Sequence, residues 1–159
     1  MADERLSHLD DEGRVRMVDV GDKPVTQRSA RAEGEIRMQP DTLAAVLSGR
    51  SSKGNVLAVA RVAAIGGAKR TSDLVPLCHP LPLDAVDVEI EADEGLPGLR
   101  IGVRTAAQAR TGVEMEALCA VAAGLLAVYD MCKGVDRGME IGPIRLLEKR
   151  GGASGPWER

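Results

Sequence analysis

Apolar and acidic side chains alternate along the stretch Asp84-Ala85-Val86-Asp87-Val88-Glu89-Ile90-Glu91-Ala92. A period of two residues predicts a β-strand that places Val86, Val88 and Ile90 on a buried face and the acidic side chains on the opposite face. Residues 95–98 have the composition of a turn, and a second strand is predicted over residues 99–107. The middle of the chain is therefore predicted to form a β-hairpin.

The sequence on either side of this hairpin supplies further strands and the helices. Extended segments are predicted at residues 14–20, 26–38 and 139–147, and helices at residues 42–49, 53–70 and 111–133. Neighbouring strands with helices on one face indicate an α+β fold, a ferredoxin-like antiparallel sheet.

The composition is that of one domain with few aromatic residues. The chain has 159 residues and a formal net charge of −3, and it contains one Trp, one Tyr and no Phe. A core built from Ala, Val, Leu, Ile and Met brings helices close together, and we expect a second subunit to complete it. The weak net charge and the shortage of aromatic rings argue against nucleic-acid binding.

The sequence also argues against export and against a structural metal. The longest apolar stretch, residues 117–131, is shorter than the ~20 residues of a membrane span, and the polar N-terminus does not resemble a signal peptide. We therefore expect a cytoplasmic protein. Cys78, Cys119 and Cys132 contain no C-x-x-C pair, which argues against a disulfide framework and a zinc site.

Several acidic residues of the long predicted helix are candidates for function. Thr111 and Glu114 match a capping box, which does not account for Glu116. Asp130 lies in the last turns, where the helix dipole disfavours an acid. The plain alternative is a solvated ion pair between Asp130 and Lys133, worth roughly 0.2–0.5 kcal/mol.

Helical geometry limits how these residues can act together. Asp130 returns to within about 40° of the face that carries Glu116, but the two stand roughly 21 Å apart along the helix axis. Either the ligand is long, or two copies of the helix pack antiparallel. Both alternatives point to a site between subunits.

Two other segments suit a phosphorylated ligand. Residues 69–80 combine two cations with Cys78 and His79 in a proline-rich loop, and His79 is either a catalyst or a packed, hydrogen-bonded residue. Cys78 and His79 alone do not make a metal site. Residues 146–155 place glycines after cations, which suits phosphate oxygens or, alternatively, a flexible C-terminus. No P-loop or G-x-G-x-x-G motif occurs.

Six segments together resemble one protein family. They are Met17-Val18-Asp19-Val20, Lys53-Gly54-Asn55-Val56, Ala68-Lys69-Arg70-Thr71, and residues 73–81, 111–118 and 129–133. In this order and spacing they resemble the cyclic pyranopterin monophosphate synthases, the molybdenum cofactor biosynthesis protein C family. The similarity extends from about residue 7 to residue 157.

The resemblance implies a lyase that converts (8S)-3′,8-cyclo-7,8-dihydroguanosine 5′-triphosphate into cyclic pyranopterin monophosphate and releases diphosphate. It implies that Asp130, Lys133 and Lys53 are catalytic. Substrate contacts are implied for Leu77, Cys78, His79, Met115, Glu116, Lys149, Lys69 and Arg28. It implies no cofactor and no metal site, although Mg²⁺ could accompany the triphosphate. A lysine among other cations loses proton affinity, which would make it a credible base near neutral pH.

The resemblance also implies an assembly, a homohexamer built as a trimer of dimers with sites at the dimer interfaces. This agrees with the separation of Glu116 and Asp130. We expect a flexible arm over residues 1–13, a single catalytic domain over residues 14–150 and a Gly-rich tail over residues 151–159.

The chain departs from the family at two positions. Ala153 replaces the usual cation of the tail, and Asn55 stands where Asp is common. One alternative function remains open, a non-catalytic oligomeric binder of a phosphorylated metabolite, although such a binder would gain nothing from a carboxylate at Asp130. An RNA-binding ferredoxin-like domain would need surface aromatics that Tyr129 and Trp157 cannot supply.

Overall fold

The structure is a computed structural model, and it describes residues 8–10, 12–49 and 54–159. Five strands form one sheet in the order β2-β3-β1-β4-β5, and all neighbouring pairs are antiparallel. The strands are β1 (Thr26–Arg37), β2 (Ala85–Asp93), β3 (Gly98–Ala109), β4 (Glu140–Arg150) and β5 (Trp157–Glu158). The helices are α1 (Pro40–Leu47), α2 (Val56–Lys69), α3 (Thr71–Leu74) and α4 (Glu114–Cys132).

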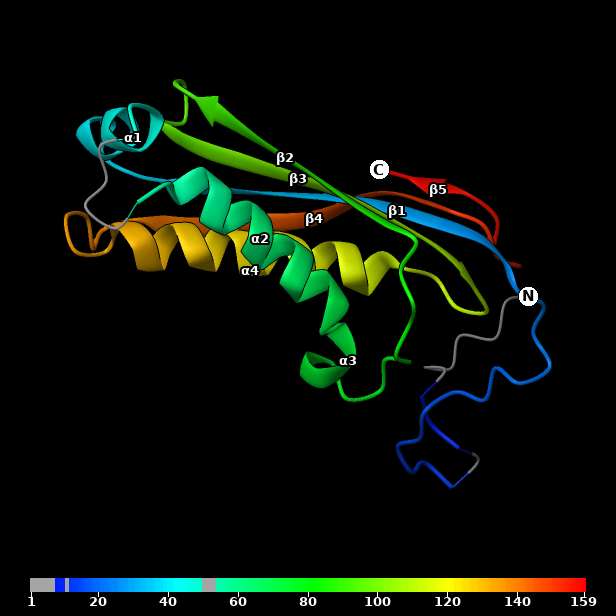
Figure 1. Cartoon of the computed structure of the whole chain (residues 1–159). Helices are drawn as coiled ribbons and strands as arrows, with labels where there is room; N and C mark the ends of the chain where they lie inside the picture. Colours follow the sequence, from blue (N-terminus) through cyan, green and yellow to red (C-terminus); the bar gives the residue numbers. More distant parts are fainter. Residues whose placement is uncertain (1–7, 11, 50–53) are drawn as a thin grey trace.

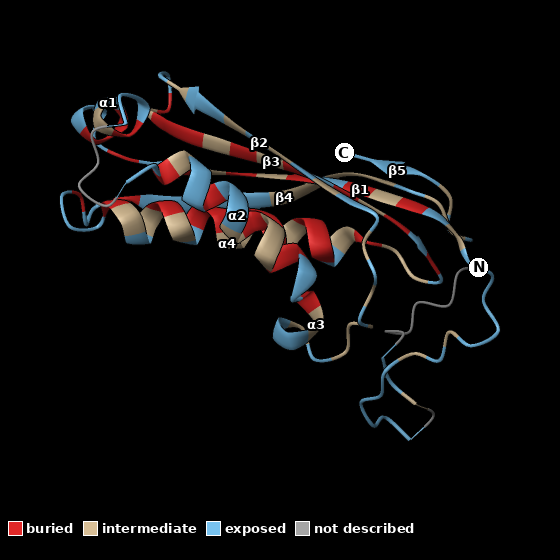
Figure 2. Ribbon diagram, in the orientation of Figure 1, coloured by how far each residue is buried: buried red, intermediate tan, exposed pale blue. Residues whose placement is uncertain are grey.

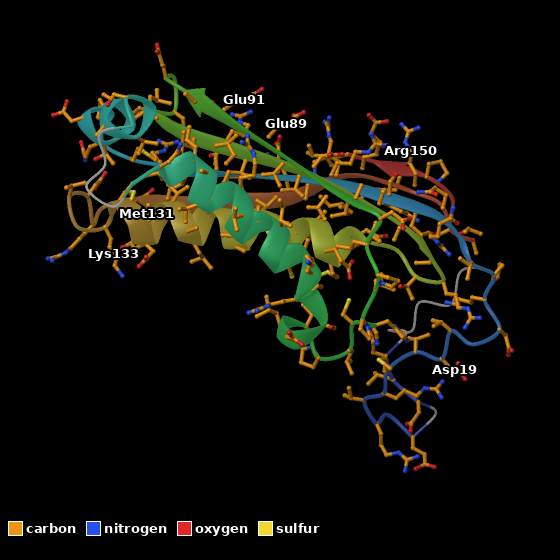
Figure 3. All side chains as sticks on the ribbon, in the orientation of Figure 1. Asp19, Glu89, Glu91, Met131, Lys133 and Arg150 are labelled. Atoms are coloured by element: carbon orange, nitrogen blue, oxygen red, sulfur yellow. The ribbon has the colours of Figure 1, made fainter. Side chains whose placement is uncertain are left out.

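Helices α2 and α4 cover one face of the sheet, as Figure 1 shows. This arrangement confirms the α+β, ferredoxin-like prediction. The register of the β2–β3 hairpin confirms the alternation that predicted it, because Val86, Val88 and Ile90 pack against the core. Glu89 and Glu91 point away from the helices on the opposite face (Figure 3).

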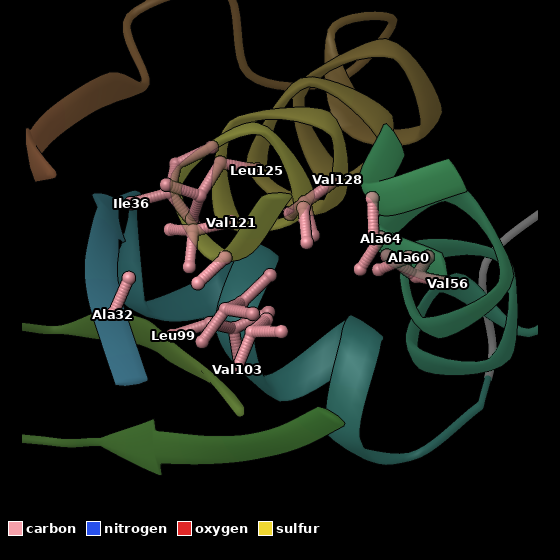
Figure 4. Packing of buried hydrophobic residues seen from close by; sticks show 14 of the residues in the cluster. Ala32, Ile36, Val56, Ala60, Ala64, Leu99, Val103, Val121, Leu125 and Val128 are labelled. Atoms are coloured by element: carbon pink, nitrogen blue, oxygen red, sulfur yellow. The ribbon is translucent and has the colours of Figure 1, made fainter. Parts of the chain in front are cut away.

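The seam between α2 and α4 is made of small residues. Ala60 and Ala64 on α2 are fully buried and face α4 (Figure 4). A Cβ on Gly67 would lie 2.6 Å from the Cβ of Ala123 and 2.8 Å from the carbonyl oxygen of Cys119, so the helices touch through this glycine. The predicted core of small aliphatic residues is therefore confirmed, whereas its completion by a second subunit stays a prediction.

The first residues of helices α2 and α4 differ in how their backbone amides are capped. Asn55 caps α2, since its side-chain oxygen accepts a hydrogen bond of 3.0 Å from the Ala58 amide. Asn and Asp cap about equally well, so the change to Asn keeps this role. The capping box predicted for α4 is wrong. Its N-cap is Val113 and makes no side-chain cap. The Thr105 hydroxyl of β3 donates to the Val113 carbonyl at 2.9 Å, which ties the start of α4 to the sheet without capping its free amides.

Several boundaries differ from the predictions. Residues 14–20 contribute only an isolated bridge between Leu9 and Val15, and α3 and β5 were not predicted. By length and composition alone α4 could cross a membrane, so the argument that its apolar segment is too short does not hold. Nearly half of that segment is buried (Figure 2), and it packs on the sheet and α2. This is typical of the core helix of a globular domain.

Candidate active site

The C-terminal end of α4 carries an exposed ion pair. The Lys133 ammonium lies 2.6 Å from the Asp130 carboxylate, and both side chains are more than half exposed. Figure 3 shows Lys133 at the tip of the helix, away from the sheet. The hydrogen bond and the charge of Asp130 raise the pKa of Lys133 above its usual value. Within one chain, the pKa of Lys133 is therefore raised, whereas the sequence suggested a lysine whose pKa is lowered by other cations.

The N-terminal end of α4 carries a buried acid. Glu116 is only 2% exposed, and the Cys78 thiol lies 3.8 Å from its Oε1. Burial is the main cause that raises the pKa of Glu116, and the nearby charge of Glu114 adds to it. Burial, followed by the charge of Glu116, raises the pKa of Cys78 to about 11. The thiol is therefore protonated near neutral pH and serves as the hydrogen-bond donor.

A cavity of about 340 Å³ lies beside this acid. Its lining residues come from the end of α2, from α3, from the proline-rich loop and from α4: Ala68, Lys69, Thr71, Ser72, Pro80, Leu81, Pro82 and Glu116. The antiparallel packing of α2 on α4, with Gly67 against Cys119, explains why Lys69 and Glu116 line the same cavity. The residues flanking Cys78 and Glu116, namely Leu77, His79 and Met115, are partly or largely accessible.

Arg28 binds the segment between β3 and α4 and also contacts the C-terminal tail. Its side chain is 9% exposed. Nε donates to the Ala109 carbonyl at 3.3 Å and Nη2 to the Arg110 carbonyl at 3.2 Å. Gly152 adopts φ +87°, and a Cβ there would lie 1.8 Å from Nη1 of Arg28. Only glycine fits this position, which places the tail directly against the guanidinium.

The predicted site residues thus form two groups at opposite ends of α4. Lys69, Cys78 and Glu116 come together at one end, and Asp130 pairs with Lys133 at the other, roughly 21 Å away by helical rise. Arg28 and Lys149 lie on strands β1 and β4, and the Lys149 ammonium contacts the Ser154 hydroxyl of the tail. Lys53 lies outside the described residues.

Asp136 was not predicted from the sequence, whereas Tyr129 belongs to the segment 129–133. Asp136 is 6% exposed, and its carboxylate accepts hydrogen bonds from the Gln39 amide at 2.8 Å and the Gly138 amide at 3.1 Å. The Tyr129 hydroxyl donates to the Arg137 carbonyl at 3.2 Å. These bonds fix the turn after α4. No sequence signal marks Asp136, since its partners are backbone groups brought together only by the fold.

A metal site needs several His, Cys, Asp or Glu side chains close together. Within residues 8–10, 12–49 and 54–159, no group of three or more His, Cys, Asp or Glu side chains is placed to hold a metal ion. Cys78 and His79 therefore have no set of further ligands in this part of the chain.

Comparison with known proteins gives a consistent match over nearly the whole chain. The model of the MoaC family matches residues 17–152. Proteins named cyclic pyranopterin monophosphate synthase from Brucella ovis and Brucella melitensis are 58% identical over 153 residues, which cover 96% of this chain and 93% of each relative. A protein of the same name from Brucella canis is 57% identical over the same lengths. The chain belongs to the MoaC family.

Proposed function

We propose that this chain is a cyclic pyranopterin monophosphate synthase that acts in molybdenum cofactor biosynthesis. It converts (8S)-3′,8-cyclo-7,8-dihydroguanosine 5′-triphosphate into cyclic pyranopterin monophosphate and releases diphosphate, which makes it a phosphorus–oxygen lyase. The observation that carries this proposal is the 58% identity over 96% of the chain to relatives with that name. The reaction uses a small molecule derived from a nucleotide, and the proposal places it in the cytoplasm.

The charges of the site suit this substrate. A triphosphate needs several cations: Lys69 lines the cavity at the N-terminal end of α4, Lys133 follows its C-terminal end, and Lys149 lies on β4 against the tail. Ring opening, ring closure and phosphate cyclisation require proton transfers, for which positioned carboxyl and amine groups suffice. In this proposal Asp130, Lys133 and Lys53 act on the reacting atoms, and the residues around Glu116 bind the substrate.

The proposal includes a shared site. The group around Glu116 and the pair Asp130–Lys133 lie on one helix, too far apart to meet one reacting atom. A two-fold axis that crosses α4 near its middle would bring the N-terminal end of one α4 to the C-terminal end of the other, and would do so at both sites because a two-fold contact is reciprocal. We therefore propose dimers that assemble into a hexamer. A light-scattering mass of a single chain at micromolar concentration would contradict this.

One experiment separates the enzyme from the alternative binder. Purified protein is incubated with the cyclic dihydroguanosine triphosphate, and the pterin product and diphosphate are both quantified. The enzyme releases them in equal amounts over many turnovers. A metabolite binder would retain the substrate unchanged, which equilibrium dialysis would detect in the same sample.

A further inference from the structure

Two carboxyl groups on one face of α4 differ sharply in their surroundings. The Glu116 residue is 2% exposed, whereas the Asp130 side chain is 64% exposed and lies 2.6 Å from a lysine ammonium. Glu116 lines the 340 Å³ cavity, and Lys69 lines the same cavity. Among the described residues, however, no ion pair joins Glu116 to Lys69 or to another cation within 4.0 Å.

The two oxygens of Glu116 are also unequal. Oε1 faces the Cys78 thiol at 3.8 Å. Oε2 is buried, and no residue in the described part of the chain gives it a hydrogen-bond partner. A buried carboxylate without a cation is costly, so such a group tends to keep its proton. Because the thiol donates to Oε1, the proton resides on Oε2.

The neighbouring titratable groups reinforce this state. Glu114 on the same helix carries a like charge, and its effect and that of burial both raise the pKa of Glu116. The backbone amide of Glu116 and, more weakly, the Cys78 thiol act in the opposite direction. The other ionisable groups on the elements packed here are Cys119 on α4, Lys69 on α2, Arg70 and Asp73 at α3, and His79 on the loop. The protonated form leaves an O–H that lacks an acceptor in the described part of the chain, and a bound ligand can supply that acceptor.

We propose that Glu116 is the proton donor of the active site, opposite Asp130 of a second copy, which accepts a proton. This inference rests on the function proposed above. When water adds to a ring carbon of the substrate, a C–O bond forms and Asp130 takes a proton from that water. The C–N bond at the same carbon breaks with its electron pair on nitrogen, the O–H bond at Oε2 breaks, and the proton forms a new N–H bond. The Glu116 carboxylate then regains a proton from water. Two carboxyl groups whose environments differ in this way can serve as an acid and a base in one reaction.

The test compares Glu116→Gln with Glu114→Gln, a matched change two residues away on the same helix. The glutamine keeps the shape and hydrogen bonds of a neutral acid but cannot release the proton. We expect kcat of Glu116→Gln to fall by ~10²–10⁴-fold with little change in KM. The decline of kcat at high pH in the wild type, where Glu116 loses its proton, should disappear. Glu114→Gln should retain kcat within about threefold and keep the decline of kcat at high pH, displaced to lower pH because the charge of Glu114 no longer raises the pKa of Glu116.

A second measurement needs neither turnover nor a stable variant. The infrared spectrum of the wild-type protein at neutral pH should contain the C=O band of a protonated carboxyl group, which disappears as the pH rises. Glu114→Gln should keep the band, and a folded Glu116→Gln should lack it. Absence of the band from the wild type at neutral pH would overturn the inference whether or not the protein makes product.

The steady-state kinetics of Glu116→Gln can also contradict the inference. If Glu116→Gln raises KM and leaves kcat unchanged, Glu116 recognises the substrate as a carboxylate and the inference is wrong. Unchanged kcat and KM would also refute it. If the wild type shows the titrating band but forms no pterin, the proposed function fails, and the proton donor fails with it for this reaction.

Discussion

The two ends of α4 carry the same kinds of groups in opposite surroundings. At the C-terminal end, Asp130 pairs with Lys133 three residues away, and water surrounds both. At the N-terminal end, Glu116 is buried and meets Cys78 from a loop 38 residues away in the sequence. The first arrangement follows from the helix alone, and the second depends on how the loop and α2 pack against it. The C-terminal end of α4 therefore holds an ionised pair in water, whereas the N-terminal end raises the pKa of a buried acid.

The largest effect should come from the exposed end. Asp130→Asn keeps the size and hydrogen-bonding reach of the side chain but removes its charge. If Asp130 transfers protons, turnover should fall by ~10²–10⁴-fold while the melting temperature and assembly stay close to wild type. Lys133→Ala should behave likewise. The double variant should be little worse than either single variant, since residues that act as a unit are not additive.

Steady-state assays of pterin formation, with melting curves of each variant, check this prediction. Near-normal activity of a folded Asp130→Asn protein would reduce the Asp130–Lys133 pair to a surface ion pair. The site would then have to be assigned to the buried end alone.

Mixing variants tests whether the two ends meet across subunits. Asp130→Asn and Glu116→Gln should each be nearly inactive alone. In a dimer of one chain of each kind, one site takes its Glu116 and its Asp130 from the unmutated positions. The purified mixed dimer should therefore have about half of wild-type activity, and an unfractionated random mixture about a quarter. The chains are co-expressed with different tags, and the mixed species is purified and assayed. A mixed species no more active than the single variants would show that each chain carries its own site.

The sequence predicted the scaffold well because its signals were local. Alternation in residues 84–92 gave the strand β2, and the small residues of α2 and α4 gave a close helix seam. Helical periodicity also placed Glu116 and Asp130 on one face. The start of α4 was predicted wrongly for the same reason. Thr111 and Glu114 have the spacing of a capping box, but the contact at this end comes from Thr105 of a distant strand, whose hydroxyl donates to the Val113 carbonyl.

The sequence could predict which residues belong to the site, but not how far each is buried or what it contacts. Nothing local indicates that Glu116 is buried while Asp130 is exposed, since both are acids on the same face of an apolar helix. The contact of Cys78 with Glu116 joins distant segments. Asp136 went unnoticed because it binds backbone amides of Gln39 and Gly138. Such partners leave no side-chain pattern in a sequence.

A smaller effect should be seen in thiol chemistry at the buried end. The pKa of Cys78, about 11, leaves far less thiolate at pH 8 than an ordinary cysteine has with its pKa of ~8.5. After allowing for the greater nucleophilicity of a more basic thiolate, alkylation should be about twenty-fold slower than for free cysteine. Iodoacetamide labelling followed by peptide mass spectrometry measures the rate. Labelling of Cys78 as fast as free cysteine would mean that the loop does not shield it.

The smallest expected effect is a dependence of stability on pH at the buried end. The pKa of Glu116 is raised in the folded protein, chiefly by burial, above the usual 4.5. Below pH 4.5 both states hold the proton, so the group contributes nothing to pH dependence. Above it, the unfolded chain loses its proton first, and the folded state becomes relatively less stable. The free energy of unfolding should therefore fall, by at most about 1.4 kcal/mol per pH unit, until the folded protein also ionises.

Glu116→Gln should remove this contribution and Asp130→Asn should keep it. The measurement is urea denaturation of wild type and both variants at pH 4, 6 and 8 and at one protein concentration, because subunit assembly adds to apparent stability. Relative to wild type, Glu116→Gln should gain stability from pH 4 to pH 8. A constant difference over this range would show that Glu116 ionises in the folded protein as readily as in the unfolded chain. The contrast between the two ends of α4 would then lie in exposure alone and not in protonation.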